Sequence, residues 1–364
     1  MPTRGDEYFV GSRYSRIDAM KIAIVNNQVP FVYGGAEFLA DWLREHLLAV
    51  GHSCEIVRVP FKWNPPHNIV NHMLAARLIK LSSIDRVIAL KFPAYYVEHD
   101  NKVLWLLHQF RQAYDLWGTP YQELPDTPEG LAIRTAIINA DNRYLRCARK
   151  IYTNSSVVSA RLSEFNGISS MVLYPPLRDE GAYHCERYGD YILCAGRVNE
   201  VKRQHLLVEA MRFVQSGVRL IVAGQPESQA YLDRLVSLVK NDHLEDKVDL
   251  KMRFVSEEEK ISLYAGALAT AYIPYDEDSY GYVSLESFHS RKAVITCSDS
   301  GGIREIVRDS ISGYVVSPTP AALGKAMDLM MLDRPSTEQM GNQGLQEVVK
   351  RSISWDTVIR ELTA

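Results

Sequence analysis

Short apolar runs alternate with longer amphipathic stretches along most of the chain. Residues 21–25 (KIAIV) form a β-branched apolar run typical of a buried parallel strand. Residues 35–50 then place apolar side chains at helical spacing. The pattern continues with predicted strands at 54–59, 86–90, 102–107 and 150–153, and a helix at 156–165. Strands separated by helices, without hairpin signals, predict a parallel sheet covered on both faces.

The alternation breaks once and then restarts. Pro175 and Pro176 cannot continue a helix and polar residues follow, so 175–190 are predicted to link two domains. Further strands are predicted at 191–195, 218–223, 247–252, 270–274, 293–297 and 313–316, with helices at 205–214, 229–241, 257–267, 282–290, 302–308, 319–331 and 336–350. The fold class is therefore α/β, with two doubly wound parallel-sheet domains at 20–174 and 191–353. Residues 1–19 lack periodicity and are expected to be a flexible extension.

Composition narrows the class of protein. The 364 residues suit two or three domains, and the net charge of −3 gives no global reason to expect nucleic acid as a partner. No apolar run reaches about 18 residues, and the amino end lacks the apolar core of a signal peptide. The five cysteines form no C-x-x-C pair and read as reduced thiols. We expect a cytoplasmic protein.

Chemistry is expected in the loops after the strands, because ligands of open α/β sheets bind at the carboxyl ends of the strands. Gly34-Gly35 follow the first strand and lead into a helix, so the backbone there can approach an anion. The dinucleotide fingerprint G-x-G-x-x-G is absent. A plain strand-to-helix turn is an equally good interpretation of this loop.

Two cations follow the first strand of the second domain. Arg197 and Lys202 are close enough in sequence to converge on one anion, although a solvated basic loop has the same pattern. Further on, Asp278 and Glu286 flank the predicted start of a helix, an arrangement suited to a phosphate between two sets of hydroxyls. Asp276-x-Asp278 also resembles a cation-binding D-x-D. Since Arg197 and Lys202 can neutralise phosphates themselves, we expect no metal.

Several of these loops together match one family. The pieces, in order, are Gly34-Gly35-x-Glu37, His108, Thr153-Asn154-Ser155, Gly196-Arg197 with Lys202, Val222-Ala223-Gly224, Phe254-Val255-Ser256, Asp278-(x7)-Glu286, Gly301-Gly302-x-x-Glu305 and Ser354-Trp355. Over residues 20–364 the set resembles the retaining glycosyltransferases of family 4. That resemblance implies a GT-B fold, in which two Rossmann-like domains face a cleft.

The resemblance also implies roles for individual residues. Arg197 and Lys202 would bind the donor diphosphate, Glu286 the ribose, and Asp278 the sugar, with His108 at the reaction centre from the opposite domain. The wider donor set would be Gly34, Gly35, Gly196, Gly224, Arg253, Phe254, Val255, Tyr280, Gly281, Tyr282, Val283 and Glu286. The amino-terminal domain would bind the acceptor, for which Lys91, Tyr95, Arg111 and Trp117 are the candidates. Residues 354–364 would form a helix that crosses back to that domain.

The expected function is metal-independent transfer of a hexose, with retention, from a nucleotide-diphosphate sugar such as a UDP-hexose. The acceptor would be a saccharide or a lipid-linked saccharide, in polysaccharide or glycoconjugate synthesis, with peripheral membrane contact left open. The family pattern has Glu where this chain has Asp278, one methylene shorter. A nucleotide-sugar-binding or scaffold protein of the same fold is the alternative. A nicotinamide dehydrogenase is a third hypothesis, against which the missing fingerprint argues.

Overall fold

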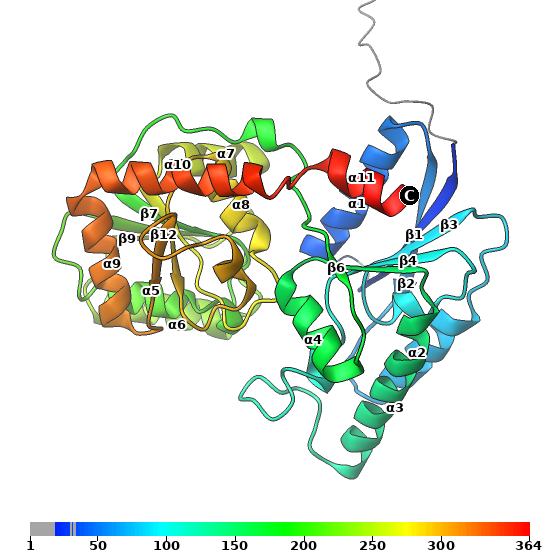
Figure 1. Ribbon diagram of the computed structural model, residues 1–364. Helices are drawn as coiled ribbons and strands as arrows, with labels where there is room; N and C mark the ends of the chain where they lie inside the picture. The colour runs from blue at the N-terminus through cyan, green and yellow to red at the C-terminus, as the bar shows by residue number, and fades with distance from the viewer. Residues whose placement is uncertain (1–18, 30, 32–33) are drawn as a thin grey trace, which may run out of the picture.

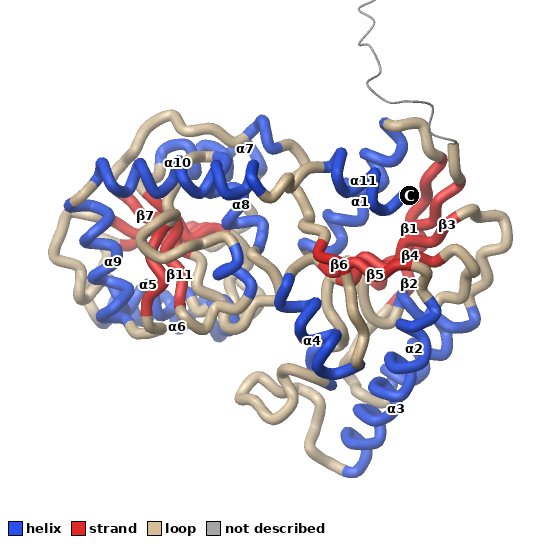
Figure 2. Tube along the Cα trace, viewed as in Figure 1, coloured by secondary structure: helices blue, strands red, loops and turns tan. Residues whose placement is uncertain are grey.

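The computed structural model describes residues 19–29, 31 and 34–364. It contains two α/β domains side by side (Figure 1), each built on a six-stranded sheet. The strands of each sheet pair in parallel, and helices lie on both faces of the sheets (Figure 2). The predicted class, two doubly wound parallel-sheet domains, is confirmed.

The amino-terminal sheet has the strand order β2-β1-β3-β4-β5-β6. Its strands are β1 Lys21–Gln28, β2 Ser53–Pro60, β3 Arg86–Ala89, β4 Lys102–Leu106, β5 Lys150–Thr153 and β6 Met171–Val172. Its helices are α1 Gly35–Ala49, α2 Asn68–Leu78, α3 Pro128–Tyr144 and α4 Ser156–Asn166. The short 3₁₀ helices η1 Ala94–Tyr96, η2 Arg111–Ala113 and η3 Leu145–Cys147 complete the domain.

A buried carboxylate organises the core between α3 and the loops after β3 and β4. Asp141 is fully buried and accepts hydrogen bonds from the hydroxyls of Tyr95, Tyr96 and Tyr114 at 2.9, 2.6 and 2.7 Å. Burial raises the pKa of Asp141 to about 6, and the three hydroxyl donors oppose that rise. The network replaces the water that the carboxylate loses on folding.

The carboxyl-terminal sheet has the strand order β12-β11-β10-β7-β8-β9. Its strands are β7 Tyr191–Ala195, β8 Arg219–Ala223, β9 Val248–Lys251, β10 Ala269–Ala271, β11 Val294–Cys297 and β12 Gly313–Val316. Its helices are α5 Gln204–Ala210, α6 Gln229–Asn241, α7 Glu257–Gly266, α8 Gly281–His289, α9 Pro320–Leu332 and α10 Arg334–Lys350, with the 3₁₀ helices η5 Glu200–Lys202 and η6 Gly302–Glu305. The segment between the domains contains one further 3₁₀ turn, η4 Glu180–Ala182.

The last helix, α11 Trp355–Thr363, leaves the carboxyl-terminal domain and lies beside α1 near β1 (Figure 1). The Trp355 ring stacks on His46 of α1 at 4.3 Å, and its Nε1 donates to the carbonyl of Leu177 at 2.7 Å. Arg86, at the start of β3, donates to the carbonyl of Leu362 at 2.8 Å. The chain therefore crosses between the domains twice.

The structure departs from the predicted elements in a few places. Helices α2 and α3 were not predicted, and the expected helix at 302–308 is only the 3₁₀ turn η6. The flexible extension predicted for residues 1–19 lies outside the described residues except for Ala19. In the described part of the chain, no helix is long and apolar enough to cross a membrane.

Candidate active site

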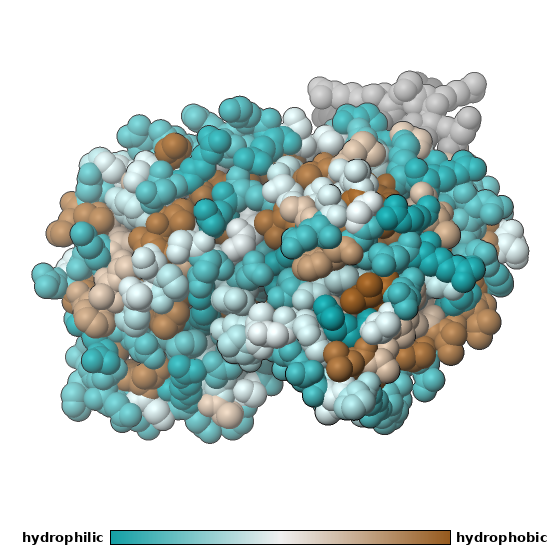
Figure 3. All heavy atoms as spheres, turned by 60° about the horizontal axis from the view of Figure 1, so that its bottom comes forward, coloured by the Kyte–Doolittle hydropathy of each residue, from teal (hydrophilic) through white to brown (hydrophobic). Residues whose placement is uncertain are grey.

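The carboxyl ends of the two sheets face each other, and side chains from the post-strand loops meet there. Ser155, after β5, donates its hydroxyl to the carbonyl of Asp278 in the other domain. Trp42 of α1 lies edge-on to Tyr282 of α8, with ring centroids 5.1 Å apart. Gly35 also faces Tyr282, since a Cβ added at Gly35 would lie 3.4 Å from its ring. Figure 3 shows the two lobes with a notch between them.

Lys202 and the amino end of α8 lie against the same tyrosine ring. The Lys202 Nζ donates to the Tyr272 hydroxyl at 2.8 Å, and a Cβ added at Gly281 would sit 2.4 Å from the Tyr272 ring. Gly281 also has a φ of +69°, so only glycine fits there without strain. The first N–H groups of α8 and the Lys202 ammonium therefore surround one small region, which favours an anion.

An acidic side chain already occupies this region. Glu277 forms an ion pair with Lys202, and both are largely buried. Burial disfavours the charged lysine, but Glu277 and Tyr272 outweigh it, so the pKa of Lys202 lies above its usual range. Burial likewise opposes the charged form of Glu277, and Lys202 outweighs it to hold that pKa low. Glu277 thus stands where an anionic ligand of Lys202 would bind.

Arg197 does not join Lys202 on a shared partner in this structure. Its guanidinium is about half exposed and pairs with Glu227 at 3.0 Å, whereas Lys202 points to Glu277. The expected convergence of the two cations is therefore not present here. A shared anion would require the exposed Arg197 side chain to swing away from Glu227, which costs little because exposed ion pairs are weak.

Asp278 sits in a cluster of charges that joins the two domains. Its carboxylate contacts Arg161 of α4 and lies 3.3 Å from Nε of Arg111 on η2. Arg161 also contacts Asp276 at 2.6 Å and Asp115 at 3.4 Å. Two arginines of the amino-terminal domain therefore hold the acid expected to bind the donor sugar, and they do so with little exposure to water.

Glu286 is buried in α8 and satisfied by three donors. Lys260 and Tyr264 of α7 donate to it at 2.7 and 2.8 Å, and Tyr183 donates at 3.1 Å. Burial by itself would lower the pKa of Lys260. The ion pair with Glu286 outweighs burial, so the pKa of Lys260 lies above its usual range and the side chain keeps its charge. The carboxylate is thus fixed in one orientation.

Two of the predicted glycine sites are required for close packing of the backbone. Gly224 needs its missing side chain because a Cβ there would lie 1.8 Å from the carbonyl oxygen of Gly196. Gly302 packs under Ser279, with an added Cβ 2.7 Å from its Cα, and its N–H donates to the carbonyl of Glu277 at 2.8 Å. Gly301-Gly302 therefore supports the 277–279 loop from beneath.

The remaining donor candidates lie at the rim or in the core. His108 follows β4, half-buried, with Nδ1 2.5 Å from the carbonyl of Gln109. Arg253 and Phe254 are exposed after β9, and Arg253 pairs with Glu259. The Tyr280 ring is buried, with its hydroxyl donated to the carbonyl of Pro175 at 2.6 Å, and the Val255 and Val283 side chains pack in the same apolar cluster.

The structure places the four acceptor candidates in different surroundings, and one of them lies in the core. Tyr95 is fully buried and binds Asp141, so the prediction that it contacts an acceptor is wrong. Lys91 pairs with Glu37 at 2.9 Å, and Trp117 packs under the guanidinium of Arg134 at 4.9 Å. Arg111 belongs to the charge cluster that joins the domains.

The partners of these candidate residues were not predicted from the sequence: Arg161, Asp115, Glu277, Tyr183, Lys260 and Tyr264. Arg161 had a partial signal in the sequence, because it lies within the first two turns of the helix that follows the post-strand cap Ser155. Tyr183 had none, because only the path of the interdomain segment brings it to Glu286. Among the described residues, no group of three or more His, Cys, Asp or Glu side chains has the geometry to hold a metal ion.

This geometry, two Rossmann-like domains facing each other across post-strand loops, is the GT-B fold. Residues 188–347 match the sequence profile of the family described as "Glycosyl transferases group 1". Among solved structures, HepE from Anabaena, crystallised with UDP and glucose, superposes with a TM-score of 0.70 at 16% identity and covers 94% of this chain and 98% of HepE. Sucrose-phosphate synthase from Thermosynechococcus elongatus superposes with a TM-score of 0.74 at 16% identity, covering 94% and 97%. At these identities the likeness shows the fold alone.

Among curated proteins, the chain is similar to alpha-1,3/1,6-mannosyltransferase ALG2. The mouse protein is 30% identical over 140 residues, 37% of this chain and 33% of its own length. The human protein is 27% identical over 139 residues, again 33% of its length. The similarity thus spans about a third of these relatives. Residues 188–347 are thus similar in sequence to the group 1 glycosyltransferases.

Proposed function

We propose that the protein is a glycosyltransferase that moves a hexose from a nucleotide-diphosphate sugar, a UDP-hexose, to a saccharide or lipid-linked saccharide. The observation that carries the proposal is the match of residues 188–347 to the group 1 glycosyltransferases, the segment that contains Lys202, Asp278 and Glu286. The UDP bound in the similarly folded HepE supports uracil as the base of the donor. The anomeric configuration is retained in the proposed reaction.

The donor diphosphate would bind between Lys202 and the amino end of α8. Binding there separates Lys202 from Glu277 and replaces one anion by another, so the buried ammonium keeps a partner. Glu286, held by Tyr183, Tyr264 and Lys260, presents a fixed carboxylate suited to ribose hydroxyls.

The charges around Lys202 fit the bond that breaks. As the hexose leaves the nucleotide, negative charge grows on the departing phosphate and positive charge on the sugar. The Lys202 ammonium and the N–H groups of α8 stabilise the first of these charges. A divalent cation is not needed for that task in the proposed mechanism. Closure of the domains would align donor and acceptor and exclude water.

A purified-protein assay with a panel of nucleotide sugars and acceptors, with and without EDTA, tests the proposal. We expect transfer from a UDP-hexose, unchanged by EDTA, with the product keeping the anomeric configuration of the donor. Lys202→Ala should lose most of the turnover, while Lys325→Ala, a lysine on α9, serves as a matched control. Wild-type rates for Lys202→Ala would refute the donor site, and loss of activity in EDTA would refute metal independence.

A nucleotide-sugar-binding protein without transfer is the second candidate. The ion pairs of two proposed catalytic side chains favour it, because both side chains already have partners. Lys202 pairs with Glu277, and Asp278 pairs with Arg161 and Arg111. Calorimetry would separate the candidates. Donor binding at micromolar concentration, without transfer or slow hydrolysis of any donor in the panel, would support the binding protein, whereas turnover would exclude it.

A further inference from the structure

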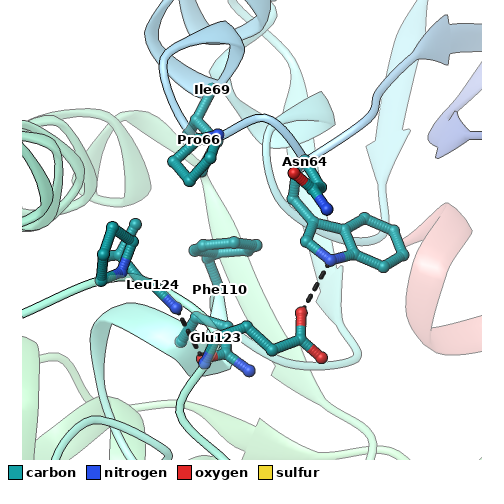
Figure 4. Close-up of a pocket in the computed structure, with 9 residues that line it drawn as sticks. Asn64, Pro66, Ile69, Phe110, Glu123 and Leu124 are labelled. Atoms are coloured by element: carbon teal, nitrogen blue, oxygen red, sulfur yellow. Dashed lines mark hydrogen bonds between the residues drawn. The ribbon is translucent and has the colours of Figure 1, made fainter.

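A separate pocket of about 360 Å³ opens in the amino-terminal domain, beside η2. It lies between the loop that follows β2, the first turn of α2, the segment after β4 and the loop before α3 (Figure 4). Its size falls at the lower end of the range for small-molecule sites. The lining residues are Trp63, Asn64, Pro66, Ile69, Phe110, Gln112, Glu123, Leu124 and Pro125.

Most of the wall is apolar and held in place from behind. Phe110 packs against the buried Phe92 at 5.0 Å and Phe61 at 6.0 Å, and Phe61 in turn contacts Trp63 at 6.3 Å. Pro66 and Ile69 face Leu124 across the opening (Figure 4). Trp63 is 43% exposed, so part of this residue is open to a ligand in the pocket.

The pocket has few polar side chains, and hydrogen bonds hold Glu123 and Gln112 in defined orientations. Glu123 accepts a hydrogen bond from Trp63 Nε1 at 2.8 Å through one carboxylate oxygen, while its other oxygen has no partner among the described residues (Figure 4). Gln112 is buried and braces the same loop, accepting from the backbone N–H of Glu123 at 2.6 Å. An aromatic ring and an acceptor-only carboxylate therefore stand side by side.

We propose that this pocket binds a neutral sugar ring of the acceptor, an inference that rests on the proposed function. A sugar ring has an apolar C–H face that covers Trp63 or Phe110, and hydroxyls at its edge that donate to Glu123. A prenyl or acyl chain would cover the second Glu123 oxygen without offering it a donor, and a phosphate or acidic sugar would meet a like charge.

The position of the pocket suits an acceptor. Phe110 and Gln112 flank Arg111, which on its other side donates to the carbonyl of Asp276 at 2.8 Å and approaches Asp278. The pocket and the Asp276–Asp278 loop therefore both contact the segment 110–112. The same segment links occupancy of the pocket to the contact between domains.

Fluorine NMR of the full chain labelled with 5-fluorotryptophan tests the pocket. The chain has five tryptophans, and Trp63→Phe assigns the resonance of interest. The probes are methyl glycosides of glucose, mannose, galactose and N-acetylglucosamine at up to about 100 mM, because single rings bind at millimolar Kd. Glycerol and farnesyl phosphate are the controls. We expect the Trp63 resonance to shift saturably with at least one glycoside and with neither control.

Two variants sharpen the result. Glu123→Gln keeps an oxygen acceptor for the indole but removes the charge, and should weaken glycoside binding several-fold. Leu78→Ala, an exposed apolar position at the end of α2, should leave binding unchanged. Farnesyl phosphate shifting the Trp63 resonance, or no glycoside shifting it, would overturn the proposal.

The outcome is independent of the proposed transfer reaction. The NMR experiment contains no donor. If a glycoside shifts the Trp63 resonance saturably in a protein that turns over no donor, the sugar-binding pocket is supported and the proposed transferase activity is refuted. If the protein turns over a donor but no glycoside shifts the Trp63 resonance, the transferase activity is supported and the sugar-binding pocket is refuted. With an active enzyme, Trp63→Ala should raise the acceptor KM about tenfold and leave the donor KM unchanged.

Discussion

Replacing Arg161 by Met should weaken the contact between the two domains more than any single change at the protein surface. The Arg161 guanidinium touches three carboxylates, those of Asp115, Asp276 and Asp278. With Arg111, two positive charges currently face three negative ones. Without Arg161, Arg111 alone would face all three.

The magnitude follows from burial. Arg161, Asp115 and Asp278 have side chains only 11 to 12% exposed, whereas Asp276 is 36% exposed. Removing one partner of a buried pair costs roughly 3–5 kcal/mol, and water at Asp276 argues for the lower figure, about 3 kcal/mol. Because the pairs with Asp276 and Asp278 cross the interface, whereas the pair with Asp115 lies within the amino-terminal domain, most of this cost falls on the closed arrangement. Its population relative to open forms should fall roughly a hundredfold.

Single-molecule energy transfer between the domains measures this shift. Dyes can be attached at Leu78→Cys and Leu332→Cys, both 76% exposed, after the exposed Cys147 is replaced by Ser. Arg178→Met is the matched control, since Arg178 is 62% exposed in its pair with Glu45 and should matter little.

Two results would contradict the reasoning about the cluster. One is a population of open forms that changes less than about twofold in Arg161→Met, well below the hundredfold worked out above. The other concerns Asp278→Asn added to Arg161→Met, which removes an uncompensated charge and should recover part of the closed population. Additive losses in the double variant would mean that the two side chains are not coupled.

Three further predictions concern individual residues. Lys202→Ala should lower kcat/KM by roughly a hundred- to a thousandfold, because it removes an electrostatic donor from the departing phosphate; turnover and donor calorimetry that both stay normal would contradict the role of Lys202. Asp141→Asn should flatten the pH dependence of stability. The folded pKa of Asp141 is raised from 3.8 to about 6, so its contribution is complete below pH 4 and falls by roughly 3 kcal/mol as the pH rises through 6; urea unfolding from pH 4 to 7 that is equally steep in both proteins would contradict this. Gly281→Ala should lower the melting temperature, since its Cβ would strike Tyr272 at a φ of +69°; Gly217→Ala, with nothing within 4 Å of the added Cβ, is the control.

The unpredicted helices show where local signals were present and where they were weak. Helix α3 begins with the cap Thr127, which accepts from the N–H of Gly130, and with Pro128 in its first turn, a readable start signal. Helix α2 has no side-chain cap and carries exposed leucines, Leu74 and Leu78, opposite its buried face. Its amphipathic pattern is therefore too weak to be recognised from spacing alone.

The order of the elements, the two sheets and the loops that carry the candidate chemistry could be read from the residues themselves. Strand runs such as 191–195 and caps such as Ser354 act over a few neighbours, so the local pattern determines them. The partners of Asp278, Lys202 and Glu286 were decided only by the tertiary structure. Arg161 lies 117 residues from Asp278, and Glu277 lies 75 from Lys202. Only the packing of one domain against the other, and of one loop across a sheet, brings such charges together. The periodicity of apolar positions in helices and strands carries no information about which distant charges will pair.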